Sequence, residues 1–376
     1  MEGIAFSPSK DFNFYSKIHA NPTPLPIKTL TLTRIPFRFH NHGHQKQPLL
    51  SFSLDPTKST QTPITQPPPL VVVGSANADI YVEIDRLPAE GETISAKNGQ
   101  TLAGGKGANQ ATCGAKLSYP TYFLGQVGDD AHGKLITQAL GNRGVRLEYL
   151  KSLGGGVPTG HAVVMLQSDG QNSIIIVGGA NMSSWPDKLS DQDLDVVKKA
   201  GIVLLQREIP DFVNIQVAKA ARSAGVTVIM DAGGMDAPIP EELLNFVDIF
   251  SPNESELGRL TGMPTENFEQ ISQAAEKCHK MGVKQVLVKL GAKGSALFIE
   301  GDEPIRQSII PAAQVVDTTG AGDTFTASFA VALVEGKSKK ECLRFAAAAA
   351  SLCVQVKGAI PSMPDRKSVL NLLQSE

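Results

Sequence analysis

The residues with the clearest chemistry form the segment D-T-T-G-A-G-D, which runs from Asp317 to Asp323 and precedes the apolar, helix-like stretch TFTASFAVAL. Gly320, Ala321 and Gly322 are small enough to let a ligand approach backbone N–H groups, which point outward toward an anion at the start of a helix. Asp323, held ionised beside a phosphate, is suited to accept the proton of an attacking hydroxyl group. The segment therefore predicts an anion hole with a general base. The alternative is that Asp323 simply caps the helix after a glycine turn.

A second glycine cluster, A-G-G-K-G-A-N from Ala103 to Asn109, also begins a helical pattern. Neither cluster has the spacing G-x-x-x-x-G-K-[ST] or G-x-G-x-x-G, so the two common phosphate-binding and dinucleotide-binding loops are disfavoured. Lys106 and Asn109 carry hydrogen-bond donors beside a backbone that a ligand can approach, which suits a ligand with many hydroxyl groups. The alternative is a helix start with an exposed lysine.

Polar side chains also follow several of the apolar runs. Asn77 and Asp79 follow VVVGSA, Glu208 follows LLQR, and Asn253 and Glu256 lie in SPNESE after a third run. Open α/β sheets bind ligands at the carboxyl ends of their strands, and Asn together with Asp can bind several hydroxyl groups. Each of these residues is equally able to form a turn or to cap the next helix, so the pattern alone leaves both readings open.

From Leu70 onward, short apolar runs alternate with amphipathic stretches. Strands are expected at 70–75, 121–125, 201–206, 226–231, 247–251 and 284–290, and helices at 107–117, 130–142, 211–224 and 267–281. The runs are rich in Val, Ile and Leu, as in strands buried on both faces, which predicts a largely parallel sheet covered by helices on both sides. Residues 81–100 and 161–179 look instead like polar-faced antiparallel ribbons, the second turning at Asp169 and Gly170, and they predict a small β layer outside the main sheet.

Length and charge limit the other possibilities. The chain has 376 residues, enough for one large α/β domain or two modest ones plus a tail. Its 35 Lys and Arg against 37 Asp and Glu give a formal charge of −2, so no general basic field exists to bind nucleic acid or an anionic membrane. No apolar run approaches about eighteen residues, so a membrane span is not supported. The four scattered cysteines contain no C-x-x-C pair and indicate free thiols.

Residues 1–69 differ in composition from the rest of the chain. They hold 11 of the 24 prolines and 14 Ser and Thr, and their seven Lys and Arg against three acids give a charge of +4. Such a segment cannot bury enough apolar surface to order itself. We therefore expect a disordered transit peptide at 1–69 and a folded part at 70–376. The scarcity of arginine favours a plastid address; the alternatives are a mitochondrial address and a cytosolic tail.

These motifs, in this order, resemble the pfkB family of carbohydrate kinases and, within it, the ribokinase branch. The resemblance runs from about Leu70 to Pro364 and is carried by GGKGANQ and DTTGAGDTF, with NADI, PNESE and LGAKG in the expected order. It implies a doubly wound α/β fold with a β lid near 80–101 and 161–179, through which relatives form homodimers. It also implies transfer of a phosphoryl group from ATP to O5 of D-ribose, giving D-ribose 5-phosphate and ADP.

The resemblance further implies a role for each matching residue. Asp323 would take the proton from the 5-hydroxyl group, while the backbone at Gly320, Ala321 and Gly322 would stabilise the transferring phosphoryl group. The residues around the sugar would be Asn77, Ala78, Asp79, Gly105, Lys106, Gly107, Asn109, Glu208 and Asp323. The residues along the nucleotide would be Asn253, Lys289, Leu290, Gly291, Ala292, Lys293, Gly294, Gly322 and Asp323. Mg²⁺ would reach the ATP phosphates mainly through water, with Asn253 and Glu256 in its outer shell.

Members of the family also hold a monovalent cation, usually potassium, beside the anion hole. The matching residues, most of which would offer backbone carbonyl oxygens, are Asp317, Thr319, Cys353, Val356, Gly358 and Ser362. The alternative is an ordinary C-terminal loop capped by a buried Asp317. The chain departs from the family's pattern at Ser328, where Ala or Gly is usual, and this small residue implies no loss of activity.

The same chemistry would serve another acceptor, namely 2-deoxyribose, fructose, a nucleoside or a sugar acid. An acidic sugar calls for an added arginine, and NADI and GGKGAN contain none, although Arg207 stands beside Glu208. A kinase-derived scaffold without catalysis is the remaining alternative, because fold alone does not fix function. Such a scaffold would be free to lose Asp323 or the glycines before it, and their presence favours an enzyme.

Overall fold

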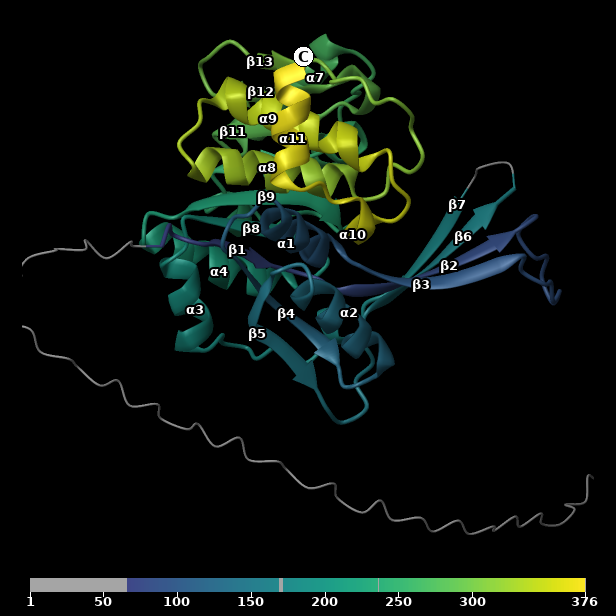
Figure 1. Ribbon diagram of the computed structural model, residues 1–376. Helices are drawn as coiled ribbons and strands as arrows, with labels where there is room; N and C mark the ends of the chain where they lie inside the picture. The colour runs from purple at the N-terminus through teal and green to yellow at the C-terminus, as the bar shows by residue number, and fades with distance from the viewer. Residues whose placement is uncertain (1–65, 169–171, 236, 376) are drawn as a thin grey trace, which may run out of the picture. The chain divides into compact units, whose positions relative to one another are not determined.

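The computed structural model describes residues 66–168, 172–235 and 237–375. Within these residues, nine strands form the main sheet in the order β13-β12-β11-β10-β9-β8-β1-β4-β5 (Figure 1). The strands are β1 Leu70–Val73, β4 Thr121–Gly128, β5 Arg146–Leu153, β8 Ile202–Arg207, β9 Thr227–Gly234, β10 Ile249–Ser251, β11 Gln285–Lys289, β12 Ser295–Ile299 and β13 Ile305–Gln307. Strands β11 to β5 run parallel, whereas β12 and β13 are antiparallel to their neighbours. The largely parallel sheet is therefore confirmed.

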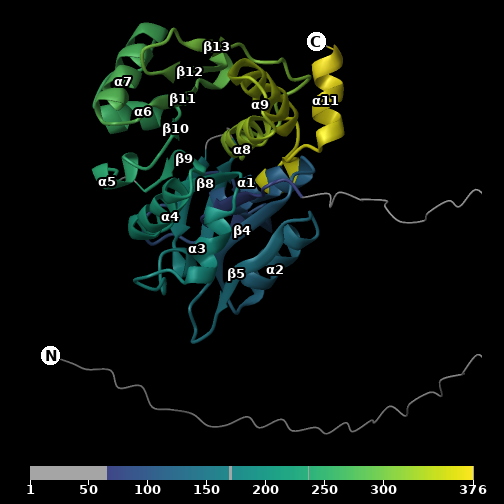
Figure 2. The same ribbon diagram turned by 90° about the vertical axis from the view of Figure 1, so that its left-hand side faces the viewer.

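Helices cover both faces of this sheet, as Figure 2 shows from the side. They are α1 Lys106–Lys116, α2 Ala131–Gly141, α3 Asp191–Lys198, α4 Asp211–Ser223, α5 Glu241–Leu244, α6 Glu254–Thr261, α7 Phe268–Lys280, α8 Ala321–Val334, α9 Lys339–Cys353, α10 Ala359–Ser362 and α11 Arg366–Ser375. The four predicted helices agree with α1, α2, α4 and α7 to within two residues at either end.

The alternation of side chains along β1 explains why both faces need a cover. All four of its residues are fully buried, but Leu70 and Val72 pack with α1, α2, α8 and α9, whereas Val71 and Val73 pack with α3, α4 and α7. Because successive side chains of a strand point to opposite faces, an all-apolar strand has two faces to bury. The result is a three-layer, doubly wound arrangement.

A smaller sheet, in the order β3-β2-β6-β7 within the described residues, projects from the main one (Figure 1). Its strands are β2 Asn77–Ile84, β3 Asn98–Gly104, β6 His161–Gln167 and β7 Asn172–Val177. The two predicted ribbons are the antiparallel pairs β2–β3 and β6–β7, and a parallel pairing of β2 with β6 joins them. The predicted turn at Asp169 and Gly170 lies outside the described residues, as does nearly all of the segment 1–69. We call this sheet the lid.

In the part of the chain that the structure describes, no helix is both long enough and apolar enough to cross a membrane.

Candidate active site

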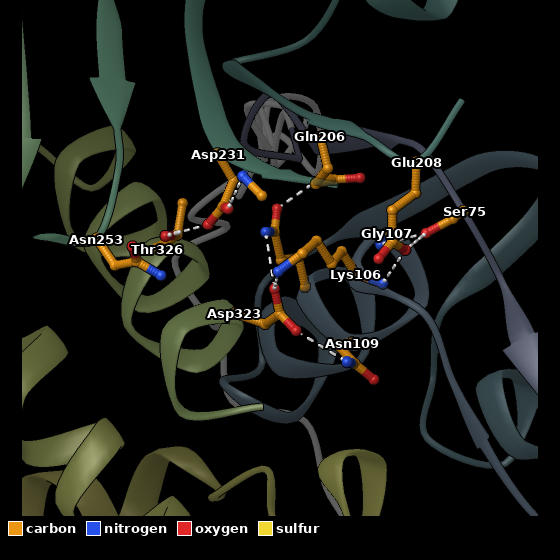
Figure 3. Close-up of polar contacts among 12 residues, drawn as sticks. Ser75, Lys106, Gly107, Asn109, Gln206, Glu208, Asp231, Asn253, Asp323 and Thr326 are labelled. Carbon is orange, nitrogen blue, oxygen red and sulfur yellow. Dashed lines mark hydrogen bonds and ion pairs between the residues drawn. The ribbon is translucent and has the colours of Figure 1, made fainter. Parts of the chain in front are cut away.

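Strands β1, β8, β9 and β10 all end at one edge of the main sheet, and each end carries a polar side chain. Ser75 follows β1, Glu208 follows β8, Asp231 lies near the end of β9, and Asn253 follows β10. Figure 3 shows them around Lys106 and Asp323, which come from α1 and α8. The parallel sheet therefore gathers residues that are far apart in the sequence, as expected for the carboxyl edge of an open α/β sheet.

The start of α8 has the geometry predicted for an anion hole. Gly320 is the N-cap residue, with a left-handed φ of 79°, and a Cβ atom there would lie 2.9 Å from Cβ of Ala359. Glycine is thus required both by the backbone conformation and by the packing. Ala321 and Gly322 follow as the first helical residues, so their N–H groups have no partner within the helix, although that of Ala321 donates to the carbonyl of Thr318 at 3.2 Å. Asp323 lies one position further on and does not cap the helix, which removes the simple capping interpretation.

The side chain of Asp323 is instead directed toward α1. Its carboxylate accepts hydrogen bonds from Nδ2 of Asn109 at 2.8 Å and Nε2 of Gln110 at 3.3 Å, and it lies 4.0 Å from Nζ of Lys106. Burial raises the pKa of Asp323 above its usual range, Lys106 opposes this, and the carboxylate of Asp231 adds to it. A buried carboxylate with a raised pKa is a stronger proton acceptor than an exposed one, as a general base requires.

Lys106 lies among carboxylates on several sides. Although burial lowers the pKa of its ammonium group, Asp323, Asp231 and Glu208 raise it above the ordinary value of lysine. Its backbone N–H donates to Glu208 at 3.1 Å, and the same carboxylate accepts from the hydroxyl of Ser75 at 2.5 Å. Lys106 is thus partly buried and held in the site, rather than an exposed lysine at a helix start.

Two glycines let α1 begin this close to the end of β1. Gly105 has a φ of 91°, and a Cβ atom on it would lie 2.7 Å from the backbone nitrogen of Asn77. On Gly107, a Cβ atom would lie 2.7 Å from the backbone nitrogen of Ser75. The GGKGAN motif therefore fixes the approach of a helix to a strand end, and so brings Lys106 and Asn109 to Asp323.

Asn77 and Asp79 lie on β2, where the chain enters the lid. Oδ1 of Asn77 accepts a 2.6 Å hydrogen bond from Asn181, which also binds the backbone N–H and carbonyl of Ala76. Burial, with Glu208 and Asp323 nearby, raises the pKa of Asp79 from 3.8 to about 7. Ala78 between them is fully buried, and its N–H donates to Gly160. The lid strand thus places an amide and a carboxyl group above the carboxyl edge of the sheet.

A cavity of about 390 Å³ adjoins the start of α8 on the side of β11. Five of the residues expected along the nucleotide line this cavity: Lys289, Gly291, Ala292, Gly294 and Gly322. Leu290 packs in the core, and Lys293 is paired with Glu254 at 3.0 Å; neither is among the lining residues. The rest of the lining is largely apolar and was not predicted: Ser295, Ile309, Ile310, Ala312, Val315, Thr318, Phe325, Ala347, Ala350, Ser351 and Val354.

Asn253 and Glu256 bind each other at the start of α6. Oδ1 of Asn253 accepts from the N–H of Glu256, and Oε2 of Glu256 accepts from the N–H of Asn253, each at 2.8 Å. This capping box fixes both side chains and uses only one of the two carboxylate oxygens. The donor set suits a hydrated Mg²⁺, which prefers oxygen ligands and keeps its waters. Among residues 66–168, 172–235 and 237–375, no group of three or more His, Cys, Asp or Glu side chains is placed to hold a metal ion.

The residues matched to the monovalent cation site also come together. Oδ2 of Asp317 accepts from the N–H of Gly358 at 2.8 Å, Sγ of Cys353 lies 3.1 Å from Oγ of Ser362, and it approaches the carbonyl of Thr319 at 4.0 Å. Asp317 therefore does tie the C-terminal loop to the segment before α8. A carboxylate with a hydroxyl group and a backbone carbonyl close by offers oxygen ligands of the kind a monovalent cation takes, and Val356 lies on the same loop between Cys353 and Gly358.

Four contributors to the site were not predicted from the sequence. Asp231, Asn181 and Gln110 make the contacts given above, and Thr326 donates to Asp231 at 3.0 Å. Asp231 is only the last residue of the strand predicted at 226–231. Gln110 directly follows GGKGAN, Thr326 lies three residues after Asp323, and Asn181 follows the glycine pair Gly178-Gly179. Each stands beside a glycine cluster but just outside the residues to which a role was assigned.

A cluster of polar side chains beside a helix N-terminus, with a buried carboxylate between them, is the arrangement of a phosphotransferase that acts on a hydroxylated acceptor. Residues 68–366 match the model of the pfkB family of carbohydrate kinases. The chain is 75% identical over 331 residues to a ribokinase of Arabidopsis thaliana, covering 87% of each chain, and 37% identical over 313 residues to a ribokinase of Bacillus subtilis, covering 81% of this chain and 99% of that protein. A solved structure of Arabidopsis thaliana ribokinase complexed with ribose and ATP aligns with a TM-score of 0.80 and 78% identity, over 82% of this chain and 99% of that one.

This chain belongs to the pfkB family of carbohydrate kinases.

Proposed function

We propose that this protein transfers the γ-phosphoryl group of ATP to O5 of D-ribose, giving D-ribose 5-phosphate and ADP. The observation that carries the proposal is the position of Asp323, which contacts the GGKGAN helix through Asn109 and Gln110 and follows the anion hole by one residue. The high identity to a ribokinase over most of the chain supports ribose as the acceptor.

The sugar would bind between the lid and the edge of the main sheet. Asp79 and Glu208 would accept hydrogen bonds from its hydroxyl groups, and Lys106 and Asn109 would donate to them. Since Asn181 binds Oδ1 of Asn77, the Nδ2 group of Asn77 is the part turned to the sugar. The backbone at Ala78, Gly105 and Gly107 completes this set by allowing a close approach.

In the transfer step, Asp323 takes the proton of the 5-hydroxyl group. The oxygen then forms a bond to the γ-phosphorus, the bond from that phosphorus to the bridging oxygen breaks, and the electron pair of the broken bond stays on the β-phosphate of ADP. The N–H groups at the start of α8 and the positive end of its dipole stabilise the negative charge of the phosphoryl group in the transition state.

The nucleotide would occupy the 390 Å³ cavity, with its phosphates directed to Gly322. We propose that Asn253 and Glu256 hold waters of the Mg²⁺ that accompanies ATP, and that the Asp317 loop holds K⁺. Magnesium supplies charge neutralisation on the phosphates, and potassium beside the anion hole would stabilise the loop that presents its N–H groups.

The test is ADP release by the purified chain with Mg-ATP and potassium, comparing D-ribose with 2-deoxyribose, fructose, adenosine and a sugar acid. We expect a strong preference for ribose. Preference for another acceptor would keep the role of Asp323 but overturn the assignment of Asn77, Asp79 and Glu208. No ADP release with any of the five acceptors would favour a kinase-derived scaffold without catalytic activity.

We also propose a homodimer formed through the lid. Strand β7 is one of the two edge strands of the lid sheet in the described residues, and its Ile174, Ile175 and Ile176 are 54%, 56% and 59% exposed. An exposed edge strand with consecutive large apolar residues favours a partner, because left alone it invites uncontrolled association. Analytical ultracentrifugation of wild type and Ile175→Glu tests this: a dimer that becomes a monomer is expected, and a wild-type monomer refutes it.

For localisation, we propose that residues 1–69 direct the chain to plastids, on the basis of their basic, hydroxyl-rich and acid-poor composition. A fluorescent protein fused after residue 69 should enter plastids in plant cells. Mitochondrial or cytosolic fluorescence would reject the plastid address.

A further inference from the structure

Asp231 is the most deeply buried charged group of the site and has no role in the mechanism above. It is 1% exposed, and three groups bind its carboxylate: Nζ of Lys289 at 2.7 Å and the hydroxyl of Thr326 at 3.0 Å on Oδ2, and the N–H of Gly233 at 3.0 Å on Oδ1. Figure 3 shows Asp231 and Thr326 on one side of Lys106, with Asp323 below. A carboxylate that three donors hold in place can in turn fix the position of the flexible side chain among these donors, that of Lys289.

Lys289 is a cation whose position matters. It is the last residue of β11, its side chain is only 12% exposed, and it lines the nucleotide cavity. A Cβ atom on Gly322 would lie 3.9 Å from its Nζ atom, so the ammonium group stands between the cavity and the anion hole. An ammonium group has three N–H donors, and the bond to Asp231 uses one of them.

A second lysine approaches from the sugar side. A Cβ atom on Gly233 would lie 2.5 Å from Nζ of Lys106 and 3.1 Å from Oδ1 of Asp231. Asp231 therefore has Lys289 on one oxygen and Lys106 near the other, while Lys106 also faces Asp323. The four groups form an alternating row of charges that runs from the general base to the nucleotide cavity.

We propose that Lys289 contacts the γ-phosphoryl group during transfer and that Asp231 is the positioning residue that holds its ammonium group there. This inference rests on the proposed function. Lysine has a long flexible stem, and anchoring removes most of its rotamer freedom before the substrate arrives. Negative charge develops on the phosphoryl oxygens as the bond to ADP breaks. A positive charge that is already fixed beside these oxygens stabilises the transition state more than the ground state.

The test compares Lys289→Met with Lys284→Met in the full chain. Lys284 is an exposed lysine just before β11, at the opposite end of the same strand, and serves as the matched control. We expect Lys289→Met to lower kcat with ribose and Mg-ATP by about 10²- to 10³-fold, with unchanged KM for ribose and unchanged affinity for ADP, which lacks the γ-phosphoryl group. Unchanged kcat with an equal loss of ATP and ADP affinity would overturn the proposal.

Two further variants keep the test decisive if Lys289→Met folds poorly, since that change leaves Asp231 buried without its partner. The double variant Lys289→Met with Asp231→Asn removes both charges together, and we expect it to fold and to stay slow; recovery of wild-type kcat would show that the pair is only structural. Lys289→Arg should restore part of kcat, because it keeps a cation near Asp231. A wild-type chain inactive on ribose would instead reject the proposed function itself.

Discussion

Asp79→Asn should stabilise the ligand-free protein while it weakens the sugar site. Asp79 lies on β2, where the chain enters the lid, and the carboxylates of Glu208 and Asp323 are close enough to repel its charge. Burial, followed by the charges of these two carboxylates, raises its pKa from 3.8 to about 7. Three carboxylates this close together suit a ligand with many hydroxyl donors, but they repel one another in its absence. Asparagine keeps the shape of the side chain and removes its charge.

The sign of the effect follows from where Asp79 ionises. In the unfolded chain it loses its proton near pH 3.8, and in the folded chain near pH 7, so the folded state binds more protons between these values. The free energy of unfolding therefore falls as the pH rises through this range, and it stays low above pH 7. The whole pKa difference lowers the free energy of unfolding by at most about 4 kcal/mol. Less than half of this loss is present at pH 5.

Thermal unfolding without sugar, at pH 5 and pH 8, measures this directly. With an unfolding entropy of about 2.1 cal/mol/K per residue, about 4 kcal/mol corresponds to a Tm that is roughly 6 °C higher for Asp79→Asn than for the wild type at pH 8. The difference in Tm between the two proteins should be smaller at pH 5. Asp85→Asn is the control, because Asp85 is an exposed lid carboxylate whose pKa the bonds from Lys97 and Ser168 lower. A gain in Tm that is equal at both pH values would refute the reasoning, whatever happens to the KM for ribose.

Three further predictions concern the same site. Asp323→Asn should fold normally, by circular dichroism, and lower kcat by about 10²- to 10⁴-fold; near-normal turnover would exclude Asp323 as the base. Replacing sodium by potassium should raise kcat in the wild type but not in Asp317→Ala, and an indifferent wild type would remove the cation from the loop. Asn181→Ala leaves the N–H and carbonyl of Ala76 unpaired, so it should lower the free energy of unfolding by about 1–3 kcal/mol and raise the KM for ribose. A change in stability alone would limit Asn181 to a structural role.

The sequence predicts the central strands of the main sheet well because these strands are buried on both faces. β1 and β8 consist largely of Val, Ile and Leu, and β9 contains the apolar run Val-Ile-Met, a composition typical of strands buried on both faces. It does not predict β5, whose sequence RLEYLKSL carries charges and whose residues are only partly buried at the sheet edge. An edge strand exposes one side to water, so its composition approaches that of a loop or helix surface.

The candidate site divides in the same way. Gly105 and Gly320 are visible in the sequence because positive φ angles and close backbone approaches admit no other residue. The role of Asn181 is not predicted from the sequence, because its contacts with Ala76 and Asn77 form only when the loop after β7 packs against the end of β1. Asp231 is an ordinary polar residue near the end of β9, and Lys289, although the family resemblance places it along the nucleotide, carries no sign of a link to Asp231. Their relation exists only because β9 and β11 lie on either side of β10, which fold topology alone determines.

The same close packing makes Gly104 a sharp test of where Asp79 must lie. A Cβ atom on Gly104 would lie 2.0 Å from Oδ2 of Asp79, and the backbone there needs no positive φ, so the conflict is purely steric. Gly104→Ala should therefore turn the carboxylate of Asp79 away from the proposed sugar site and raise the KM for ribose, while ADP affinity stays unchanged, because the proposed nucleotide cavity adjoins α8 on the side of β11. Gly99→Ala, on the same strand, is the matched control: its Cβ atom would have an ordinary contact of 3.6 Å with the carbonyl of Tyr81. If both variants bind ribose as the wild type does, the carboxylate of Asp79 is not a sugar ligand in this orientation.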